Sequence, residues 1–128
     1  MLLLDTHAFV WLASAPEELS PRARRAIREN AGHLYISAIS ALEIAILVKR
    51  NRLSLPLLPD EFIRRALKQH NLHEIPVDRS IAITSTMLPD LHSDLFDRII
   101  IATARLERMS ILTKDRVIPR YPDVKVIW

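Results

Sequence analysis

Five acidic residues lie where a carboxylate is costly, beside apolar runs that are expected to become core. They are Asp5, Glu43, Asp94, Asp97 and Asp115. Asp5 directly follows Leu2–Leu4, and Glu43 is the one formal charge between Ile36 and Val48. Neither residue has a Lys or Arg beside it in the sequence. Because a charge at the edge of a core costs free energy unless it is paired, we expect these carboxylates to meet in space around a divalent cation.

Repulsion between carboxylates sets the scale of that cost. Two carboxylates about 4 Å apart repel by about 4 kcal/mol at an effective dielectric constant of about 20. Several in one cleft would therefore cost a large share of the roughly 5–15 kcal/mol that stabilises a domain. Only a bound cation or raised pKa values would make such a cluster tolerable. The chain has no Cys, so the ligands would be oxygen atoms, which favours Mg²⁺ or Mn²⁺.

Most of these acids also have a purely local interpretation. Asp5 would cap a helix that begins near Ala8, or form an Asx-turn. Asp94 would be a helix N-cap, and Asp97 would lie in the first turn, where the helix dipole favours an acid by about 0.3–1 kcal/mol. Asp115 would lie in a plain surface turn. Their joint occurrence at the ends of core elements is what favours a shared site.

Glu43 likewise has two interpretations. It would be the far end of a capping box that begins at Ser40. Ser37 is the better N-cap, however, because it directly follows a predicted strand. Ser37, Ser40 and Glu43 then recur every three residues and form a polar stripe on an otherwise apolar helix. This pattern favours a functional carboxylate at Glu43.

Composition restricts the class of protein. The chain has 128 residues, 49% hydrophobic and 26% charged, which is typical of a single globular domain spanning 1–128. Its apolar runs fall short of the roughly 18 residues of a membrane span, and the absence of Cys fits a reducing cytoplasm. The net charge of +3 and the pI near 9.7 favour a polyanionic partner such as nucleic acid. A single glycine, Gly32, excludes Gly-rich phosphate loops.

Apolar runs and capping signals predict alternating strands and helices. We expect strands at Leu2–Leu4, Leu34–Ile36, His73–Val77, Ser110–Thr113 and Val124–Ile127. We expect helices at Ala8–Ala13, Pro21–Asn30, Ala38–Lys49, Asp60–His70, Ser80–Met87 and Leu95–Arg108, with Ser20 as an N-cap and left-handed turns at Gly32 and Asn51. This alternation predicts an α/β fold with a mostly parallel sheet. Sites in such folds gather at the carboxyl ends of strands, where Asp5 and Asp115 fall.

Four segments, in this order along the chain, resemble the motifs of PIN domains. They are Leu-Leu-Asp-Thr-His at 3–7, Ser-Ala-Ile-Ser-Ala-Leu-Glu-Ile at 37–44, His-Ser-Asp-Leu-Phe-Asp-Arg-Ile-Ile-Ile-Ala-Thr-Ala at 92–104 and Leu-Thr-Lys-Asp at 112–115. Within that family the chain is most similar to VapC-type toxins of bacterial toxin–antitoxin pairs, over nearly its whole length. The resemblance implies a PIN-like (Rossmann-like) α/β/α sandwich. It also implies a Mg²⁺- or Mn²⁺-dependent ribonuclease that forms a homodimer and is inhibited by a cognate VapB-type antitoxin.

The resemblance also implies roles for single residues. Asp5, Glu43, Asp97 and Asp115 match the four acidic positions of the family, and Asp94 matches an additional Asp of one subgroup. Asp5 and Asp97 would be the main metal ligands, with Asp94 and Asp115 completing the site and Glu43 holding a water or a second ion. Supporting roles would fall to Thr6, Arg98 and Thr113. The substrate would be an RNA, such as tRNA or rRNA.

Departures from the family pattern are few. Leu95 stands where the subgroup usually has Pro, Thr103 where Gln is usual, and Asn51 where Gly is common. None of them touches the four main acids. The serious alternative function is a degenerate PIN domain that binds RNA or a protein without cutting. A phosphatase of the haloacid-dehalogenase kind is disfavoured, because His7 stands where its Asp-x-Asp motif requires Asp.

Three further features have two interpretations each. Basic residues crowd two segments and would form either solvated faces or phosphate tracks: Arg22, Arg24, Arg25 and Arg28 in one, and Lys49, Arg50 and Arg52 in the other. His7 and His92 flank the presumed metal ligands and would contact substrate or only make local hydrogen bonds. Apolar residues at Leu53–Leu58 and at Phe9, Val10 and Trp11 would pack in the core or line a partner groove.

Overall fold

Five parallel strands form the sheet at the centre of the molecule. The computed structural model describes residues 1–128, and its strands are β1 (Leu2–Leu4), β2 (Leu34–Ser37), β3 (Leu72–Ile75), β4 (Ser110–Leu112) and β5 (Val126–Ile127). Their order in the sheet is β3-β2-β1-β4-β5, and every neighbouring pair is parallel. The predicted parallel sheet is therefore confirmed.

β1 lies in the middle of the sheet because its sequence suits burial on both faces. Leu2, Leu3 and Leu4 are all fully buried, as expected for a parallel strand covered by helices on both sides. Leu3 pairs with Tyr35 of β2 on one side and with Ile111 of β4 on the other. β2 and β3 lie on one side of β1, and β4 and β5 lie on the other, so the strand order reverses at β1. Open α/β sheets usually carry their sites at such a switch point.

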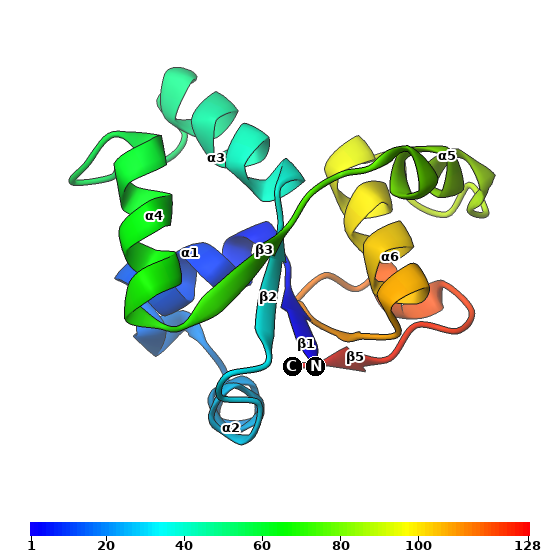
Figure 1. The fold of residues 1–128 in the computed structure, drawn as a ribbon, viewed down its shortest axis with the longest axis horizontal. Helices are drawn as coiled ribbons and strands as arrows, with labels where there is room; N and C mark the ends of the chain where they lie inside the picture. Colours follow the sequence, from blue (N-terminus) through cyan, green and yellow to red (C-terminus); the bar gives the residue numbers. More distant parts are fainter.

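Six helices cover the two faces of the sheet. They are α1 (Thr6–Ser14), α2 (Pro21–Glu29), α3 (Ile39–Lys49), α4 (Pro59–Gln69), α5 (Arg79–Met87) and α6 (Leu95–Glu107), with short 3-10 helices at Pro16–Glu18 and Ile118–Arg120. Figure 1 shows α1 and α4 on one side of the sheet and α5 and α6 on the other. None of the helices has the length and apolar character needed to cross a membrane.

The core is divided by the sheet into two apolar clusters. Leu2 and Leu4 point to the face covered by the first four helices, where they pack in one cluster with Phe9 of α1. Leu3 points to the other face and packs with Ile100 of α6. This split follows from the alternation of side chains along a strand, so three consecutive leucines supply both clusters.

Capping residues fix several element boundaries. Ser20 caps α2 as predicted, accepting a hydrogen bond from Ala23 N at 3.0 Å. Gly32 and Asn51 adopt positive φ angles of 81° and 57°, which confirms the predicted left-handed turns. Asp78, which was not predicted as a cap, accepts from Ile81 N at 2.9 Å and begins α5 one residue earlier than expected.

Other boundaries differ from the prediction for identifiable reasons. α1 begins at Thr6 rather than Ala8, because Asp5 directly precedes and caps it. β3 ends at Ile75 rather than Val77, since Pro76 has no N–H to continue the ladder. β5 spans only Val126–Ile127 because Asp123, at φ 61°, turns the chain just before it.

Candidate metal centre and active site

A cavity of about 360 Å³ opens at the carboxyl edge of the sheet, and we call it the acidic cavity. Its lining residues come from α1, α3, the start of α6 and the loops before α6 and after β4: Asp5, His7, Trp11, Glu43, His92, Asp94, Asp97, Lys114 and Asp115. The fold thus brings together all five acidic residues that the sequence singled out. They approach one another from segments that are far apart in the chain.

Asp5 lies at the point where β1 ends and α1 begins. Its Oδ1 accepts a hydrogen bond from Ala8 N at 2.8 Å, so the N-cap predicted as its local role is present. Its Oδ2 accepts a hydrogen bond from the hydroxyl of Thr113, which follows β4. The same hydroxyl accepts a hydrogen bond from Asp115 N at 3.0 Å. Thr113 therefore ties the ends of β1 and β4 together beneath the cavity.

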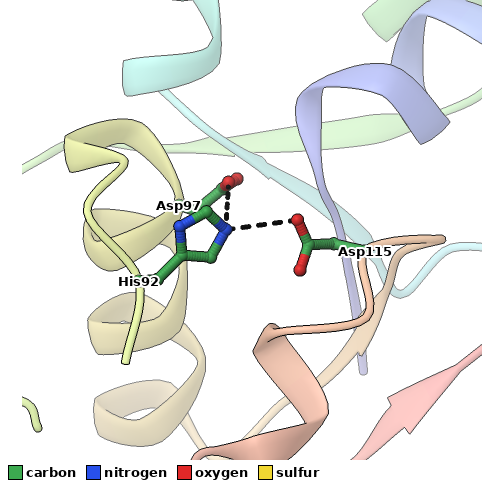
Figure 2. Close-up of side chains that lie close together, drawn as sticks. All are labelled: His92, Asp97 and Asp115. Atoms are coloured by element: carbon green, nitrogen blue, oxygen red, sulfur yellow. Dashed lines mark hydrogen bonds and ion pairs between the residues drawn. The ribbon is translucent and has the colours of Figure 1, made fainter. Parts of the chain in front are cut away.

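His92 joins Asp97 and Asp115 across the cavity (Figure 2). Its Nε2 lies 3.0 Å from Asp97 Oδ2 and 3.2 Å from Asp115 Oδ2. On the other side of the ring, Nδ1 accepts a hydrogen bond from Asp94 N at 3.3 Å. Because Nδ1 is an acceptor, the ring proton belongs on Nε2 and is shared between the two carboxylates.

Asp115 is held by the turn that follows it. Its Oδ1 accepts hydrogen bonds from Val117 N at 2.7 Å and Ile118 N at 3.0 Å. Burial alone would raise the pKa of this carboxyl, but these two amide donors and His92 hold the pKa below its ordinary value of 3.8. Asp115 is thus ionised at neutral pH and offers its second oxygen, Oδ2, to the cavity.

Asp94 and Asp97 occupy the first turn of α6. Asp94 Oδ1 accepts hydrogen bonds from Phe96 N at 2.8 Å and Asp97 N at 3.2 Å, so the expected N-cap is present and leaves Oδ2 for the cavity. Replacement of the usual Pro by Leu95 leaves this start intact. Asp97 lies at the end of this first turn and lines the cavity with the other acids.

Glu43 projects into the cavity from the second turn of α3. The polar stripe predicted on this helix faces inward: Ser37 and Ser40 are fully buried. Ser40 Oγ accepts the Thr6 hydroxyl at 2.9 Å, which links α3 to α1. Glu43 Oε1 is shielded from solvent and has no hydrogen-bond partner. A buried carboxylate oxygen without a partner is costly, and this oxygen is available to a ligand in the cavity.

Burial and nearby charges raise the pKa values of three acids in the cluster. Burial, reinforced by the charge of Asp94, raises the pKa of Asp97 from 3.8 to about 7. Burial also raises the pKa of Asp5, although Thr113 and the Ala8 amide work against it. The pKa of Glu43 is raised by burial, with partial relief from the nearby Thr6 hydroxyl. The carboxylates accordingly resist being charged together.

The donor set fits a hard divalent cation. The cavity offers five carboxylates and two imidazoles, and the ligand atoms of His92, Asp97 and Asp115 lie within 4.8 Å of one another. Carboxylate oxygens without thiolates favour Mg²⁺ or Mn²⁺ over softer metals. A cation here would offset the negative charge of Asp94, which adds to burial in raising the pKa of Asp97.

Arg98 does not line the cavity but supports the loop that carries His92. Its guanidinium donates to the carbonyl oxygens of Ser85 at 2.9 Å, Leu88 at 3.0 Å and His92 at 3.2 Å. It therefore fastens the α5–α6 loop, which carries His92, to the helix that carries Asp97. Of the other predicted supporting residues, Thr6 and Thr113 are both buried beneath the acids.

Comparison with known proteins places this arrangement in a family. The family model for the PIN domain matches residues 2–124. The ribonuclease VapC22 of Mycobacterium tuberculosis is 33% identical over 130 residues, which cover 99% of this chain and 98% of that protein. The chain belongs to the PIN-domain family, and to its VapC group. The resemblance seen in the sequence motifs is thereby confirmed.

Solved structures show the same fold as this PIN domain. VapBC2 from Rickettsia felis, bound to a DNA fragment from its promoter, has a TM-score of 0.73 at 16% identity, covering 98% of this chain and 96% of that one. A toxin–antitoxin complex from Klebsiella pneumoniae has a TM-score of 0.67 at 24% identity, covering 97% and 95%. The predicted PIN-like α/β/α sandwich is confirmed by this likeness.

The cavity of this PIN domain also contains residues that the sequence did not assign to it. Trp11 was grouped with Phe9 and Val10 as core or partner surface; Phe9 and Val10 are core, whereas Trp11 lines the cavity. Lys114, which the sequence showed only within the motif at 112–115, also lines the cavity. His7 and Trp11 are four residues apart on α1 and therefore share a face of it, but the helix was predicted only over Ala8–Ala13, so the sequence did not pair them.

Two predicted surface features lie apart from the cavity. Arg22 and Arg25 of α2 line a separate hollow with Lys125, close to β5. The apolar side chains left exposed near α3 and α4 are Leu42 and Leu58. These features give the PIN domain basic and apolar surfaces outside its candidate active site.

Proposed function

We propose that this chain is a metal-dependent endoribonuclease toxin, acting as one PIN domain over residues 1–128, and neutralised by a cognate antitoxin. The observation that carries the proposal is the convergence of five carboxylates on one cavity, where the pKa of Asp97 is raised to about 7 and a Glu43 oxygen is left without a partner. A stable core would not maintain such a cluster without a ligand. Ribonuclease VapC22, at 33% identity, supports the reaction class.

Each acid has a role in this proposal. Asp5 and Asp97 would be the main ligands of a Mg²⁺ or Mn²⁺ ion, completed by Asp94 and Asp115. Bound there, the ion supplies Lewis-acid chemistry: it makes a water acidic enough to attack at neutral pH and offsets charge on phosphate oxygens. Glu43, whose Oε1 is free, would orient that water and accept its proton.

The supporting residues keep these acids in place. Thr113 holds Asp5 by the hydrogen bond to Oδ2, and Thr6 links α1 to α3 through Ser40. Arg98 holds the loop that places His92 between Asp97 and Asp115. Preorganised ligands lose little freedom when cation and substrate arrive, which is why such support contributes to rate.

The partners are an RNA substrate, an antitoxin of the VapB type and a second copy of the chain. Structures similar in fold are toxin–antitoxin complexes, which supports the antitoxin. Exposed Leu42 and Leu58 beside α3 and α4 offer it apolar surface. Ile83 and Met87 of α5, 54% and 76% exposed, offer a second apolar surface to the other copy of a homodimer. Light scattering of the purified chain would measure the dimer directly.

Cleavage of a mixed tRNA and rRNA pool tests the proposed reaction. Purified protein, freed of any antitoxin, is incubated with the pool in Mg²⁺, in Mn²⁺ and in EDTA. We expect discrete fragments with either metal and none in EDTA. Asp97→Asn should abolish the fragments, because it removes a main ligand while preserving shape.

A matched control separates the site from general acidity. Asp90 is fully exposed in the α5–α6 loop and lies outside the cavity, so Asp90→Asn should cleave like the parent chain. Full activity of Asp97→Asn with unchanged metal affinity would overturn the assignment. Retention of RNA without cleavage in every arm would instead point to a degenerate PIN domain that only binds.

A further inference from the structure

One wall of the acidic cavity is built from an aromatic ring and two basic side chains. Trp11 is the one apolar residue among those that line the cavity. The His7 ring lies one helical turn away on α1, with its centroid 5.8 Å from that of Trp11. Lys114 Nζ lies 5.9 Å from the Trp11 ring. We call His7, Trp11 and Lys114 together the Trp11 platform.

The platform has a firm base. Trp11 is half-buried and packs against the apolar cluster on its side of the sheet. The ring of Trp128, at the end of the chain, supports it at a centroid distance of 5.7 Å. α1 itself is fixed at its start by the Asp5 cap. The indole is thus held in place, while His7 and Lys114 are exposed to solvent beside it.

From this arrangement we infer that the Trp11 platform binds an unpaired nucleotide of the RNA next to the phosphate that is cut. Its base stacks on the Trp11 indole beside His7, and Lys114 pairs with a neighbouring phosphate. The inference rests on the proposed ribonuclease function and deepens it by naming the residues that hold the substrate beside the phosphate that is cut. Bases paired within a duplex have no free face to stack on an indole.

The chemistry of the wall favours a nucleotide over other ligands. An aromatic ring next to basic groups suits a base joined to phosphates, and stacking tolerates every base because each has a π face. The acids of the cavity repel an anion, so a substrate phosphate needs positive groups at the entrance. Lys114 and His7 are the basic residues on this wall.

Lys114 need not compete with the base for the indole. A distance of 5.9 Å is near the limit of about 6 Å for a cation–π contact, so the present contact is weak. The ammonium group is exposed on a flexible four-carbon stem. It is therefore free to turn toward a phosphate oxygen when a base takes the ring face.

Tryptophan fluorescence gives a direct test, because the chain has only two Trp residues. In a protein carrying Trp128→Phe and Asp97→Asn, Trp11 is the sole tryptophan, and RNA is expected to bind without being cut. A ten-nucleotide oligouridylate should quench its emission saturably in Mg²⁺, whereas inorganic polyphosphate of equal charge should not. Oligouridylate that binds, by anisotropy of a terminal dye, without quenching Trp11 would overturn the inference.

Kinetics with matched variants separate stacking from packing. Trp11→Leu keeps apolar bulk but removes the indole, and should raise KM for a single-stranded RNA by about tenfold or more, while Trp11→Phe stays within about threefold of the parent. An equal KM for Trp11→Leu and the parent chain, with both folded by thermal melting, would overturn the platform.

The Lys114 contact has its own readout. Lys114→Ala should raise KM and reduce the slope of log KM against log salt by about 0.7, the effect of one lost phosphate contact on a single strand. Lys68→Ala removes an exposed lysine of α4, outside the acidic cavity and outside the predicted basic segments, and serves as the control. An unchanged salt slope in Lys114→Ala would overturn this part of the inference.

Failure of the platform and failure of the proposed function give different results. Metal-dependent cleavage that is indifferent to Trp11→Leu refutes the platform and leaves the ribonuclease intact. Quenching of Trp11 by oligouridylate without cleavage by the parent chain refutes the ribonuclease and leaves the platform intact. If the antitoxin quenches Trp11 and oligouridylate does not, this wall binds protein and the inference is wrong.

Discussion

His92 bridges two carboxylates that reach the cavity from different elements. Its Nε2 lies 3.0 Å from Asp97 on α6 and 3.2 Å from Asp115 after β4. Asp94 N donates to the opposite ring nitrogen, so the bridging atom carries the proton. The N–H of one imidazole is thus shared between two acids and offsets part of their repulsion.

Removal of His92 should shift the pH at which the protein binds Mg²⁺ to a higher value. His92 lowers the pKa of Asp97 against the larger effect of burial. In His92→Ala that pKa rises further, and because a ligand must be deprotonated, metal affinity at pH 7 should fall several-fold. Calorimetric Mg²⁺ titrations from pH 6 to 9 would show the midpoint moving upward. His33→Ala, which alters an exposed histidine outside the cavity, should leave it unchanged.

The metal-free protein should lose stability as the pH rises from about 4 to 7. The pKa of Asp97 is about 7 in the folded chain against 3.8 for the free side chain, so over this window the unfolded state binds fewer protons. With partial solvent screening, the loss amounts to roughly 2–4 kcal/mol. Asp5 and Glu43 add to it in the same direction. Asp115, whose pKa is lowered, acts oppositely, and its effect is complete at lower pH.

Asp97→Asn separates this effect from general acid denaturation. In EDTA at pH 7 the variant should unfold at a higher urea concentration than the parent, because it has no charge to bury. At about pH 3 or below, where Asp97 is mostly protonated in both folded and unfolded chains, the two should differ little. A parent chain that is equally or more stable at pH 7 would show that the cluster is not strained.

Much of the fold followed from local sequence signals. Leu2–Leu4 is apolar on both faces, which is enough to place it within a parallel sheet, and Ser20-Pro21 marks a helix start by side-chain and ring chemistry alone. Boundaries were less secure where two signals competed. β3 ends at Ile75 because the missing N–H of Pro76 prevails over the apolar character of Val77.

The candidate site was predicted in its acids but not in its surroundings. A carboxylate beside an apolar run is conspicuous, so all five acids were found from type and position. His92 was expected to contact substrate or to make local hydrogen bonds, and its bridge was missed because Asp97 and Asp115 meet only in three dimensions. Arg98 was expected to be supporting. Arg98 gives this support by donating to backbone carbonyls. Where those carbonyls lie depends on the path of the loop, which the side-chain pattern of the sequence does not predict.

Two buried threonines make a matched pair for testing the support beneath Asp5. Thr113 donates to Asp5 Oδ2 and accepts from Asp115 N, whereas Thr103 donates only to the Ile99 carbonyl of its own helix, at 2.7 Å. Thr113→Val removes the donor to Asp5 Oδ2 and the acceptor of Asp115 N, and should cost about 1–3 kcal/mol in unfolding free energy. Thr103→Val should cost under about 1 kcal/mol, since the carbonyl keeps its helix bond. Urea denaturation of both would reveal whether the costs are instead alike.

Arg98 should prove essential to the loop rather than to the chemistry. Its guanidinium holds the carbonyls of Ser85, Leu88 and His92, and a lysine ammonium lacks the planar fork to do so. Arg98→Lys should destabilise the chain by roughly 2–3 kcal/mol and increase hydrogen exchange in the α5–α6 loop. Arg105→Lys, on the same helix with one long pair of 3.9 Å to Asp123, is the control. Equal protection of the loop in both variants would argue against this anchoring role.

Glu43 gives the sharpest test of the metal-dependent reaction. Glu43→Gln keeps the shape but loses the charge, and should reduce cleavage in Mg²⁺ by roughly 10²-fold. The same variant should be more stable than the parent in EDTA, because burial raises the pKa of Glu43 and its Oε1 has no partner. Mg²⁺ at 100 times its dissociation constant should stabilise the parent by about 2.7 kcal/mol and the variant by less.

Opposite signs in the two measurements are what make the Glu43 test informative. A residue needed only for packing would lower activity and stability together. A carboxylate kept for a ligand lowers activity but raises metal-free stability when it is neutralised. Glu61→Gln removes an acid that pairs with Arg65 on the surface of α4, at 2.8 Å, and should change neither quantity appreciably. Loss of stability in Glu43→Gln in EDTA would mean that the buried carboxylate is stabilised by the protein itself, and the case for a cation at this cavity would fail.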